Sequence, residues 1–188
     1  MRGWLAGVLL SSGAAAFAAP ATLCHAGETS YFSCTMGAAH KIASLCGHDA
    51  EPRWLQYRFG LPGHAPELQV PARLDDPQMG TTFLYDGSRR ADGKLDSWGV
   101  WFKNTDAIYE LEYVVNRDDG PPEYADILLW TSATQEVPRV LSCTSAAGAK
   151  GLREVVDLIR AMSPPGRSEM GSAWDEQVKR QRAAGVAR

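Results

Sequence analysis

Four cysteines carry the clearest chemistry in this sequence: Cys24, Cys34, Cys46 and Cys143. Thiols can pair into disulfides, bind zinc or act as nucleophiles, and their number and spacing separate these uses. The number is even, and no two cysteines have the C-x-x-C spacing typical of a zinc site. Because an export-type segment precedes them, we expect two disulfide bonds, no metal site and no free thiol.

Paired carboxylates are a second source of chemistry. Glu110 and Glu112 share one face of an expected strand, with their carboxylates about 7 Å apart. That separation is compatible with the two carboxylates of a glycosidase. A solvent-facing side of a strand explains the pair equally well, and we prefer that interpretation. The segment 48–51 (HDAE) places an imidazole beside two carboxylates, but no nucleophile stands out beside it, so we interpret it as a polar loop.

Histidines and standard motifs add no further site. The four histidines, which all lie in the first half of the chain, are His25, His40, His48 and His64. None of them has the i, i+4 spacing of a helical metal pair, so we expect solvated surface histidines. The sequence has no G-x-S-x-G, H-E-x-x-H, P-loop or G-x-G-x-x-G pattern. We therefore expect no catalytic residue and no cofactor.

Aromatic side chains gather in the second half of the chain, at Trp98, Trp101, Phe102, Tyr109, Tyr113 and Trp130. Strand alternation places Trp101 on the face opposite Trp98 and Phe102. One aromatic set can therefore lie outside the core, as at a binding surface. The alternative, which we prefer, is a second packing layer supplied by the C-terminal helix.

Strands must position most of these groups. Alternating or aromatic-rich runs predict strands at residues 29–36, 40–47, 54–60, 67–70, 81–85, 98–103, 108–115, 125–131 and 137–144. Residues 88–94 are expected to be an exposed loop. Apolar residues at helical spacing predict a helix at residues 152–162. The predicted fold class is mainly β (α+β): an antiparallel sheet or small open barrel with one or two C-terminal helices, stapled by disulfides.

The run 54–60 shows the clearest alternation. Its apolar residues Leu55, Tyr57 and Phe59 fall on one face, and Gln56 and Arg58 fall on the other. This is the pattern of a half-buried strand, with the polar pair toward water.

Hairpin geometry ranks the possible disulfides. With a turn at residues 37–39, Cys34 faces Ile42 and Cys46 faces Ser30. The two cysteines are then about 13 Å apart along the strands. A disulfide needs Cα atoms within about 7 Å, so these two cysteines are not expected to pair.

Two connectivities remain. The preferred one joins Cys24 to Cys46 and Cys34 to Cys143, because the chain before the first strand brings Cys24 near Cys46. The alternative, which stays open, joins Cys24 to Cys34 and Cys46 to Cys143.

The start of the chain predicts export. Arg2, the apolar run 4–10 and the A-x-A sites at 16–18 and 19–21 follow the pattern of a signal peptide, and the run is too short to span a bilayer. We expect residues 1–21 to be cleaved and residues 22–165 to form one β-rich domain. Residues 166–188 are expected to be a loosely attached helical tail. The expected location is periplasmic or secreted, with no membrane span after cleavage.

Short motifs in the first half resemble those of a group of uncharacterised bacterial exported proteins. They are C-x-x-x-E at residues 24–28, F-S-C at 32–34, K-x-x-S-L-C at 41–46 and L-Q-Y-R-F-G at 55–60. The resemblance covers residues 24–68 and implies export, but no activity. In architecture the chain is also similar to periplasmic lysozyme inhibitors, whose Ser-Gly loop enters the lysozyme cleft; residues 86–90 (DGSRR) are the nearest segment here.

Charge narrows the expected partner. The formal net charge of −3 provides no general attraction for nucleic acid or anionic lipid. We expect an unknown protein or glycan partner outside the cytoplasm. The expected function is a non-catalytic exported binding or inhibitor-like domain of the bacterial envelope. The alternative is a small hydrolase acting on envelope glycan or peptide, which would need a cleft with convergent titratable groups.

Overall fold

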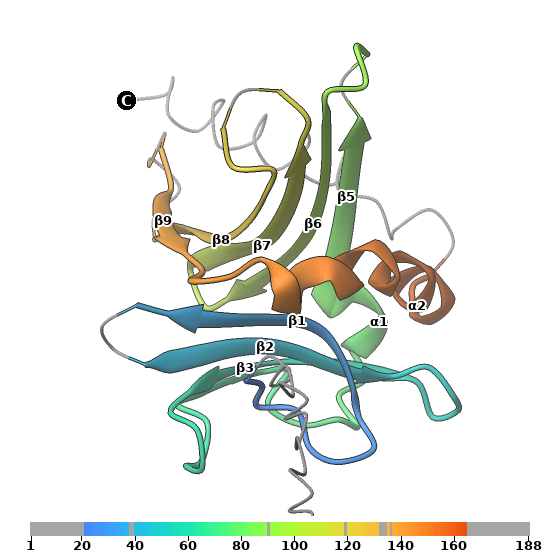
Figure 1. Cartoon of the computed structure of the whole chain (residues 1–188). Coiled ribbons are helices and arrows are strands. Elements are labelled where there is room, and N and C mark those ends of the chain that lie inside the picture. Colours follow the sequence, from blue (N-terminus) through green and yellow to red (C-terminus); the bar gives the residue numbers. More distant parts are fainter. Residues whose placement is uncertain are drawn as a thin grey trace, which may run out of the picture.

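A computed structural model gives the fold of the chain (Figure 1). It describes residues 21–37, 40–89, 91–118, 120–131, 135 and 137–164. Most of the expected signal peptide and the whole expected tail, residues 166–188, lie outside these ranges. Within them, no helix is both long enough and apolar enough to cross a membrane.

The described strands form two antiparallel sheets, which confirms the mainly β class. The first sheet has the order β1-β2-β3-β4, with β1 at Thr29–Met36, β2 at Lys41–His48, β3 at Trp54–Gly60 and β4 at Leu68–Val70. The second has the order β5-β6-β7-β8-β9, with β5 at Phe83–Arg89, β6 at Leu95–Asn104, β7 at Ala107–Asn116, β8 at Glu123–Trp130 and β9 at Arg139–Ser142. The helical elements are α1 at Met79–Thr82, the 3₁₀ helix η1 at Ala147–Arg153 and α2 at Val155–Met162.

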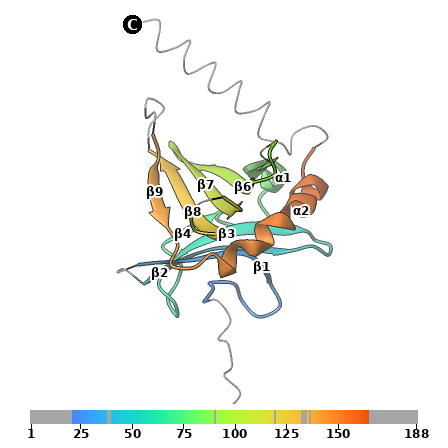
Figure 2. The same ribbon diagram turned by 45° about the horizontal axis from the view of Figure 1, so that its top comes forward.

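The two sheets cross rather than align. In Figure 1, β1 to β3 run across the picture while β5 to β8 run up it, and Figure 2 shows the same crossing from a second direction. Apolar side chains of both sheets meet in one core, to which the first sheet contributes Phe32, Leu45 and Tyr57 and the second contributes Phe102, Leu111 and Ile127. The segment of η1 and α2 closes one side of this core with Leu152, Val155, Leu158 and Ile159.

The helical segment differs from the single helix expected at residues 152–162. It begins earlier, as the 3₁₀ helix η1, and continues as α2 after Glu154. Glycines explain the early start, because η1 lies directly against β1. A Cβ on Gly151 would lie 2.7 Å from the backbone oxygen of Tyr31, and one on Gly148 would collide with the backbone oxygen of Ser33. Only glycine permits this approach, and helical periodicity alone does not reveal it.

The region around β5 also differs from expectation. In place of one short strand at residues 81–85, the chain forms the helical turn α1 and then a strand that extends to Arg89. Ser88 and Arg89 pair with Ser97 and Asp96 of β6, so the loop expected at residues 88–94 begins later. Long-range pairing with β6 thus outweighs the local turn signal of the Asp-Gly pair at residues 86–87.

Both disulfides have the connectivity preferred from the sequence. Cys24 is bonded to Cys46 with a Cα separation of 5.4 Å, and Cys34 is bonded to Cys143 with a Cα separation of 5.0 Å. The first bond lies within the first sheet's layer, and the second joins β1 to the chain just after β9. All four cysteines are therefore used in structural bonds.

The hairpin register is correct at one end and wrong by one residue at the other. Cys46 faces Ser30 as expected, but Cys34 faces Ala43 rather than Ile42. The register shifts between Ser30 and Phe32, where β1 contains a bulge or irregularity. An inserted residue of this kind shifts all pairing on one side of it.

The closing role of α2 is testable with Leu158→Asp. Leu158 is buried in the shared core, so the substitution places an unpaired carboxylate in an apolar contact. We expect a loss of about 3–5 kcal/mol in the free energy of unfolding. The control is Ala161→Asp, the same new side chain at an exposed position of the same helix, with an expected cost below about 1 kcal/mol. Thermal melts that showed equal effects for both variants would contradict the packing of α2 on the core.

Candidate functional site

The outer face of the first sheet is covered by residues 21–28, here called the N-terminal strap. The Cys24–Cys46 disulfide ties the strap to β2. The backbone N–H of Leu23 donates to Ser44 Oγ at 2.9 Å, and Ser33 Oγ donates to the backbone oxygen of Ala21. The face that alternation assigned to water is therefore covered by the chain itself.

This cover corrects the interpretation of β3. Gln56 and Arg58 are only 3% and 2% exposed, although the alternating pattern predicted that they face water. The error has a physical reason: a period-two pattern shows which residues share a face, but not whether a distant segment lies over that face.

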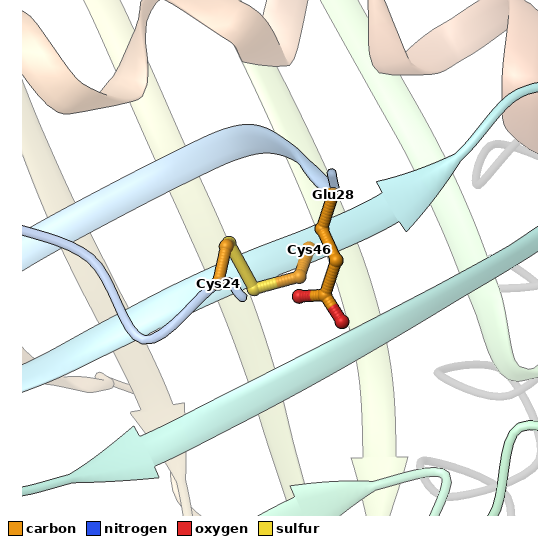
Figure 3. Close-up of side chains that lie close together, drawn as sticks. All are labelled: Cys24, Glu28 and Cys46. Carbon is orange, nitrogen blue, oxygen red and sulfur yellow. A yellow bond between two sulfur atoms is a disulfide. The ribbon is translucent and has the colours of Figure 1, made fainter. Parts of the chain in front are cut away.

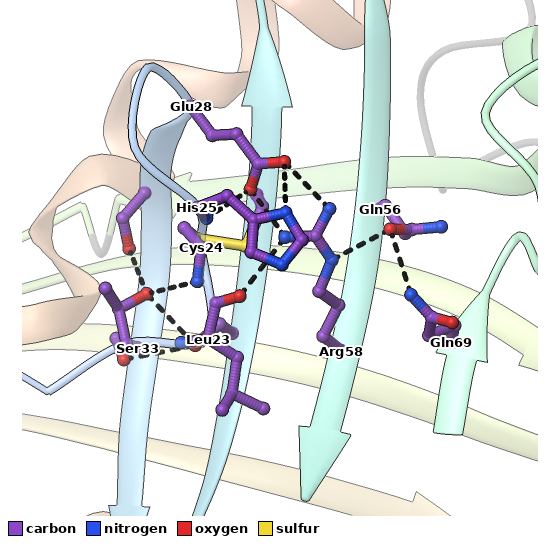
Figure 4. The surroundings of a disulfide bond; sticks show 12 residues. Leu23, Cys24, His25, Glu28, Ser33, Gln56, Arg58 and Gln69 are labelled. Atoms are coloured by element: carbon purple, nitrogen blue, oxygen red, sulfur yellow. Dashed lines mark hydrogen bonds and ion pairs between the residues drawn. A yellow bond between two sulfur atoms is a disulfide. The ribbon is translucent and has the colours of Figure 1, made fainter. Parts of the chain in front are cut away.

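The buried guanidinium of Arg58 forms several hydrogen bonds, which Figure 4 shows as dashed lines. It donates to both carboxylate oxygens of Glu28, with Nη1 at 2.5 Å from Oε2 and Nη2 at 2.9 Å from Oε1. It also donates to the backbone oxygen of Leu23 at 3.1 Å and to Gln56 Oε1 at 2.8 Å. Because these hydrogen bonds occupy donors that a ligand would need, we assign Arg58 the role of holding the strap.

Glu28 is held ionised by the same contacts. Burial alone would raise its pKa, but hydrogen bonds from Arg58 and from the backbone N–H of His25, together with their charges, outweigh burial and lower the pKa below its usual value. The Glu28 carboxylate also lies near the sulfur atoms of Cys24 and Cys46 (Figure 3). Those sulfurs are joined to each other and are not thiolates, so this group does not offer metal ligands.

Glu28→Gln tests the strap. The substitution leaves the Arg58 charge buried without a carboxylate, and we expect a loss of about 3–5 kcal/mol at neutral pH. Because the folded pKa of Glu28 is lowered, its contribution is present above pH 4.5 and is lost as the pH falls through the folded pKa. The two proteins should therefore converge in acid. The control is Glu67→Gln, which removes the exposed ion pair with Lys41 and should cost less than about 1 kcal/mol. Equal denaturation midpoints for the two variants would refute the role of Glu28.

The outer face of the second sheet has a different character. Its register aligns one row of side chains across β5 to β9: Leu84, Trp101, Glu110, Leu128 and Val140. The next row on the same face consists of Asp86, Gly99, Glu112, Asp126 and Ser142. We call these two rows, together with Trp130, the acidic–aromatic face. The alternate residues of the same strands, such as Val100 and Leu111, point into the core.

Glu110 lies at the centre of this face. A Cβ on Gly99 would lie 3.0 Å from Glu110 Oε1 and 3.2 Å from the indole nitrogen of Trp101. The absence of a side chain at Gly99 therefore makes room for both groups. Burial, followed by the charges of Glu112 and Asp86, raises the pKa of Glu110 to about 8. Glu110 therefore keeps its proton at neutral pH.

The neighbours of Glu110 complete the face. Burial, followed by the charge of Asp126, raises the pKa of Glu112 above its usual value. Trp101 stacks on Trp130, with ring centroids 5.2 Å apart and an interplanar angle of 25°. Acidic groups and a flat aromatic pair thus lie side by side on one side of the sheet.

The candidate residues from the sequence are brought together only in part. Glu110 and Glu112 do share a face, but both are half-buried rather than fully solvent-facing. Trp101 does lie opposite Phe102, which is buried in the core. Trp98 also lies on the inner side, where it stacks on Tyr113 at 5.7 Å.

Sequence reasoning missed Asp86 and Asp126. Both stand near Glu112 only through strand pairing, so the register of β5 with β6 and of β7 with β8 is the signal that could have found them. Residues 86–89 belong to β5 and pair with β6, so they do not form a loop that could enter a cleft.

The histidines are not gathered. His25, His40 and His64 are exposed in separate loops and turns, and His48 lies at the end of β2 with Nδ1 2.9 Å from the backbone oxygen of Ala50. In the described part of the chain, no histidine belongs to a group of possible metal ligands.

The segment 48–51 borders a cavity of about 370 Å³ between β1 and α2. Its lining includes Tyr31, Asp49, Arg53, Glu154 and Asp157. Arg53 is already bonded to the carboxylate of Glu51 and to the backbone oxygen of Asp49. Because the guanidinium of Arg53 is already bonded to neighbouring residues of the chain, we regard this cavity as a weaker candidate than the acidic–aromatic face.

Comparisons with known proteins found no match to the chain among family models, curated proteins or solved structures.

The raised pKa of Glu110 predicts a pH effect on stability. Between pH 4.5 and about 8 the folded protein keeps a proton that the unfolded chain releases, so the wild-type protein loses stability as pH rises through this range. Glu110→Gln keeps a neutral side chain at every pH. We expect the variant to be more stable than wild type at pH 8 by about 1–3 kcal/mol, allowing for solvent screening, and equal to it near pH 4.5. Denaturant titrations at several pH values measure this; parallel curves for the two proteins would exclude a buried, protonated Glu110.

Proposed function

We propose that this protein is a non-catalytic exported binding domain, and that its acidic–aromatic face binds a cationic polypeptide segment outside the cytoplasm. The observation that carries the proposal is the placement of Asp86, Glu110, Glu112 and Asp126 on the same face as the stacked pair Trp101 and Trp130. Guanidinium and ammonium groups interact favourably both with carboxylates and with aromatic faces. Arginine or lysine side chains flanked by apolar ones are the chemistry that this face complements.

The location rests on two supports. Two disulfide bonds are typical of proteins in oxidising compartments. The apolar run and small residues at the start of the chain have the pattern of a signal peptide, which agrees with such a compartment. A bacterial periplasm or the extracellular space therefore suits the proposal, with a protein as the partner.

One observation favours the alternative, a small hydrolase acting on envelope glycan or peptide. Glu110 is protonated near pH 7, as a general acid must be, and Glu112 is two residues away on the same strand. The binding proposal is stronger because the carboxylates of Glu112, Asp126 and Asp86 form a row along a sheet face. Under the binding proposal, the protein should not hydrolyse peptidoglycan or casein.

Titration of a fluorescent peptide tests the proposal. The probe is a short peptide rich in arginine and tryptophan, and the matched control peptide carries glutamate in place of arginine. We expect the cationic probe to bind and the acidic one not to bind. Binding should weaken as salt is raised from 50 to 500 mM and strengthen as Glu110 loses its proton near pH 8.

Substitutions then locate the binding surface. Glu112→Gln and Trp130→Ala should each weaken probe binding by roughly fivefold to tenfold, which corresponds to about 1 kcal/mol. Glu67→Gln, which removes one negative charge from the first sheet, is the matched control and should leave affinity unchanged. Equal affinity for the two peptides, or equal affinity of all variants, would refute the proposal.

A further inference from the structure

The described chain ends beside the edge strand of the second sheet. Arg160 near the end of α2 donates a hydrogen bond to the hydroxyl of Tyr85 in β5. A Cβ on Gly80 of α1 would collide with the backbone oxygen of Met162, so the end of α2 packs directly on α1. At this point the chain is next to β5, whose outward residues Leu84 and Asp86 begin the two rows of the acidic–aromatic face.

The length of the following chain is enough to cross that face. The seven residues 165–171 can span at most about 24 Å when extended. Neighbouring strands are about 4.8 Å apart, so β8 lies about 14 Å from β5 across the sheet. Residues 172–188, here called the C-terminal segment, can therefore reach Glu110, Glu112 and Trp130 without strain on the linker.

The C-terminal segment has two acidic residues near its start, Asp175 and Glu176, but its second half complements the charges of the face. From Lys179 to the end of the chain the charged side chains are all basic: Lys179, Arg180, Arg182 and Arg188. The opposing rows contribute the carboxylates of Asp86, Glu112 and Asp126, and Glu110 adds an acidic group that is neutral at pH 7. The opposite charges of the two partners favour this contact.

Apolar residues complement each other as well. Trp174 and Val178 are four residues apart, the spacing that places two side chains on one side of a helix, and the sequence predicts that Ser172 caps such a helix. The face offers Leu84, Leu128 and the Trp101–Trp130 stack. Val140, in the same row, is 51% exposed and extends this apolar surface to β9.

The burial of Glu110 supports a cover over the face. Glu110 points away from the core, and its neighbours in the row, Trp101 and Leu128, stand beside it on adjacent strands. Side neighbours shield a carboxylate only in part, yet burial is the main cause of its raised pKa. A segment lying across the row would add to this burial.

We propose that the C-terminal segment of each molecule binds to its own acidic–aromatic face, with Trp174 near the tryptophan stack and Lys179, Arg180 and Arg182 beside the carboxylates. This inference deepens the proposed function, because it names an internal occupant of the same face. The segment acts as an intramolecular competitor. An external cationic ligand must displace it, so the apparent affinity for that ligand is reduced by the fraction of molecules in which the segment is bound.

Zero-length crosslinking of the full mature chain tests the contact. A carbodiimide joins a lysine amine to a carboxylate only when the two groups touch. Lys150 and Glu123, whose atoms lie 2.8 Å apart, provide an internal positive control. We expect Lys179 to be joined to Glu110 or Glu112 in a product of monomer size. If the control link forms while Lys179 is unlinked, is linked to another region or is linked between two copies, the inference is wrong.

Peptide titration separates this inference from the proposed function. In full-length protein, Lys179→Glu/Arg180→Glu/Arg182→Glu should release the face and raise affinity for the cationic probe about tenfold. The matched control, Lys41→Glu/Arg53→Glu/Arg73→Glu, changes the net charge equally at residues of the first sheet and its loops and should have a much smaller effect. Probe binding that is equal in all three proteins overturns the inference and leaves the proposed function standing. Failure of every protein to bind the probe overturns the proposed function, and the crosslink then decides the inference alone.

Discussion

The fold depends on the junction between β1 and the chain that follows β9. At this place the Cys34–Cys143 disulfide joins the two sheets, and the backbone N–H of Thr144 donates to the oxygen of Thr35 at 3.0 Å. Closing a loop of 109 residues constrains the unfolded chain by up to about 5 kcal/mol. Because the sheets cross, this junction between β1 and the chain after β9 sets their relative position. The 3₁₀ helix η1 can then lie against β1 through Gly148 and Gly151.

The inner faces of the two sheets share one core, but their outer faces differ in character. On the first sheet the N-terminal strap covers Arg58, whose charge is balanced by Glu28 within the chain, so that this face contributes to stability. On the second sheet, burial raises the pKa of Glu110, and the neighbouring carboxylates of Glu112 and Asp86 raise it further. Such like-charge clustering weakens a fold, and that cost is the physical reason to look for function on the second face.

Local pattern was sufficient for much of the architecture. The bounds of β1 and β3 follow from aromatic and alternating residues alone, because a strand with one buried face must repeat every two residues. The short hairpin also excluded a bond between Cys34 and Cys46, and of the two connectivities that remained open the structure has the preferred one. The helix at residues 152–162 was correct for α2 but not for η1, because the early start depends on contact with β1.

The sequence by itself therefore determined the strand periods, the mainly β class and the side of β7 on which Glu110 and Glu112 lie. Only the tertiary structure decided that Arg58 is buried and that Asp86 and Asp126 lie near Glu112. The physical reason is the range of the interactions. A repeat of two residues is imposed within one strand, whereas burial of a face and the meeting of charges from different strands depend on segments that are distant along the chain.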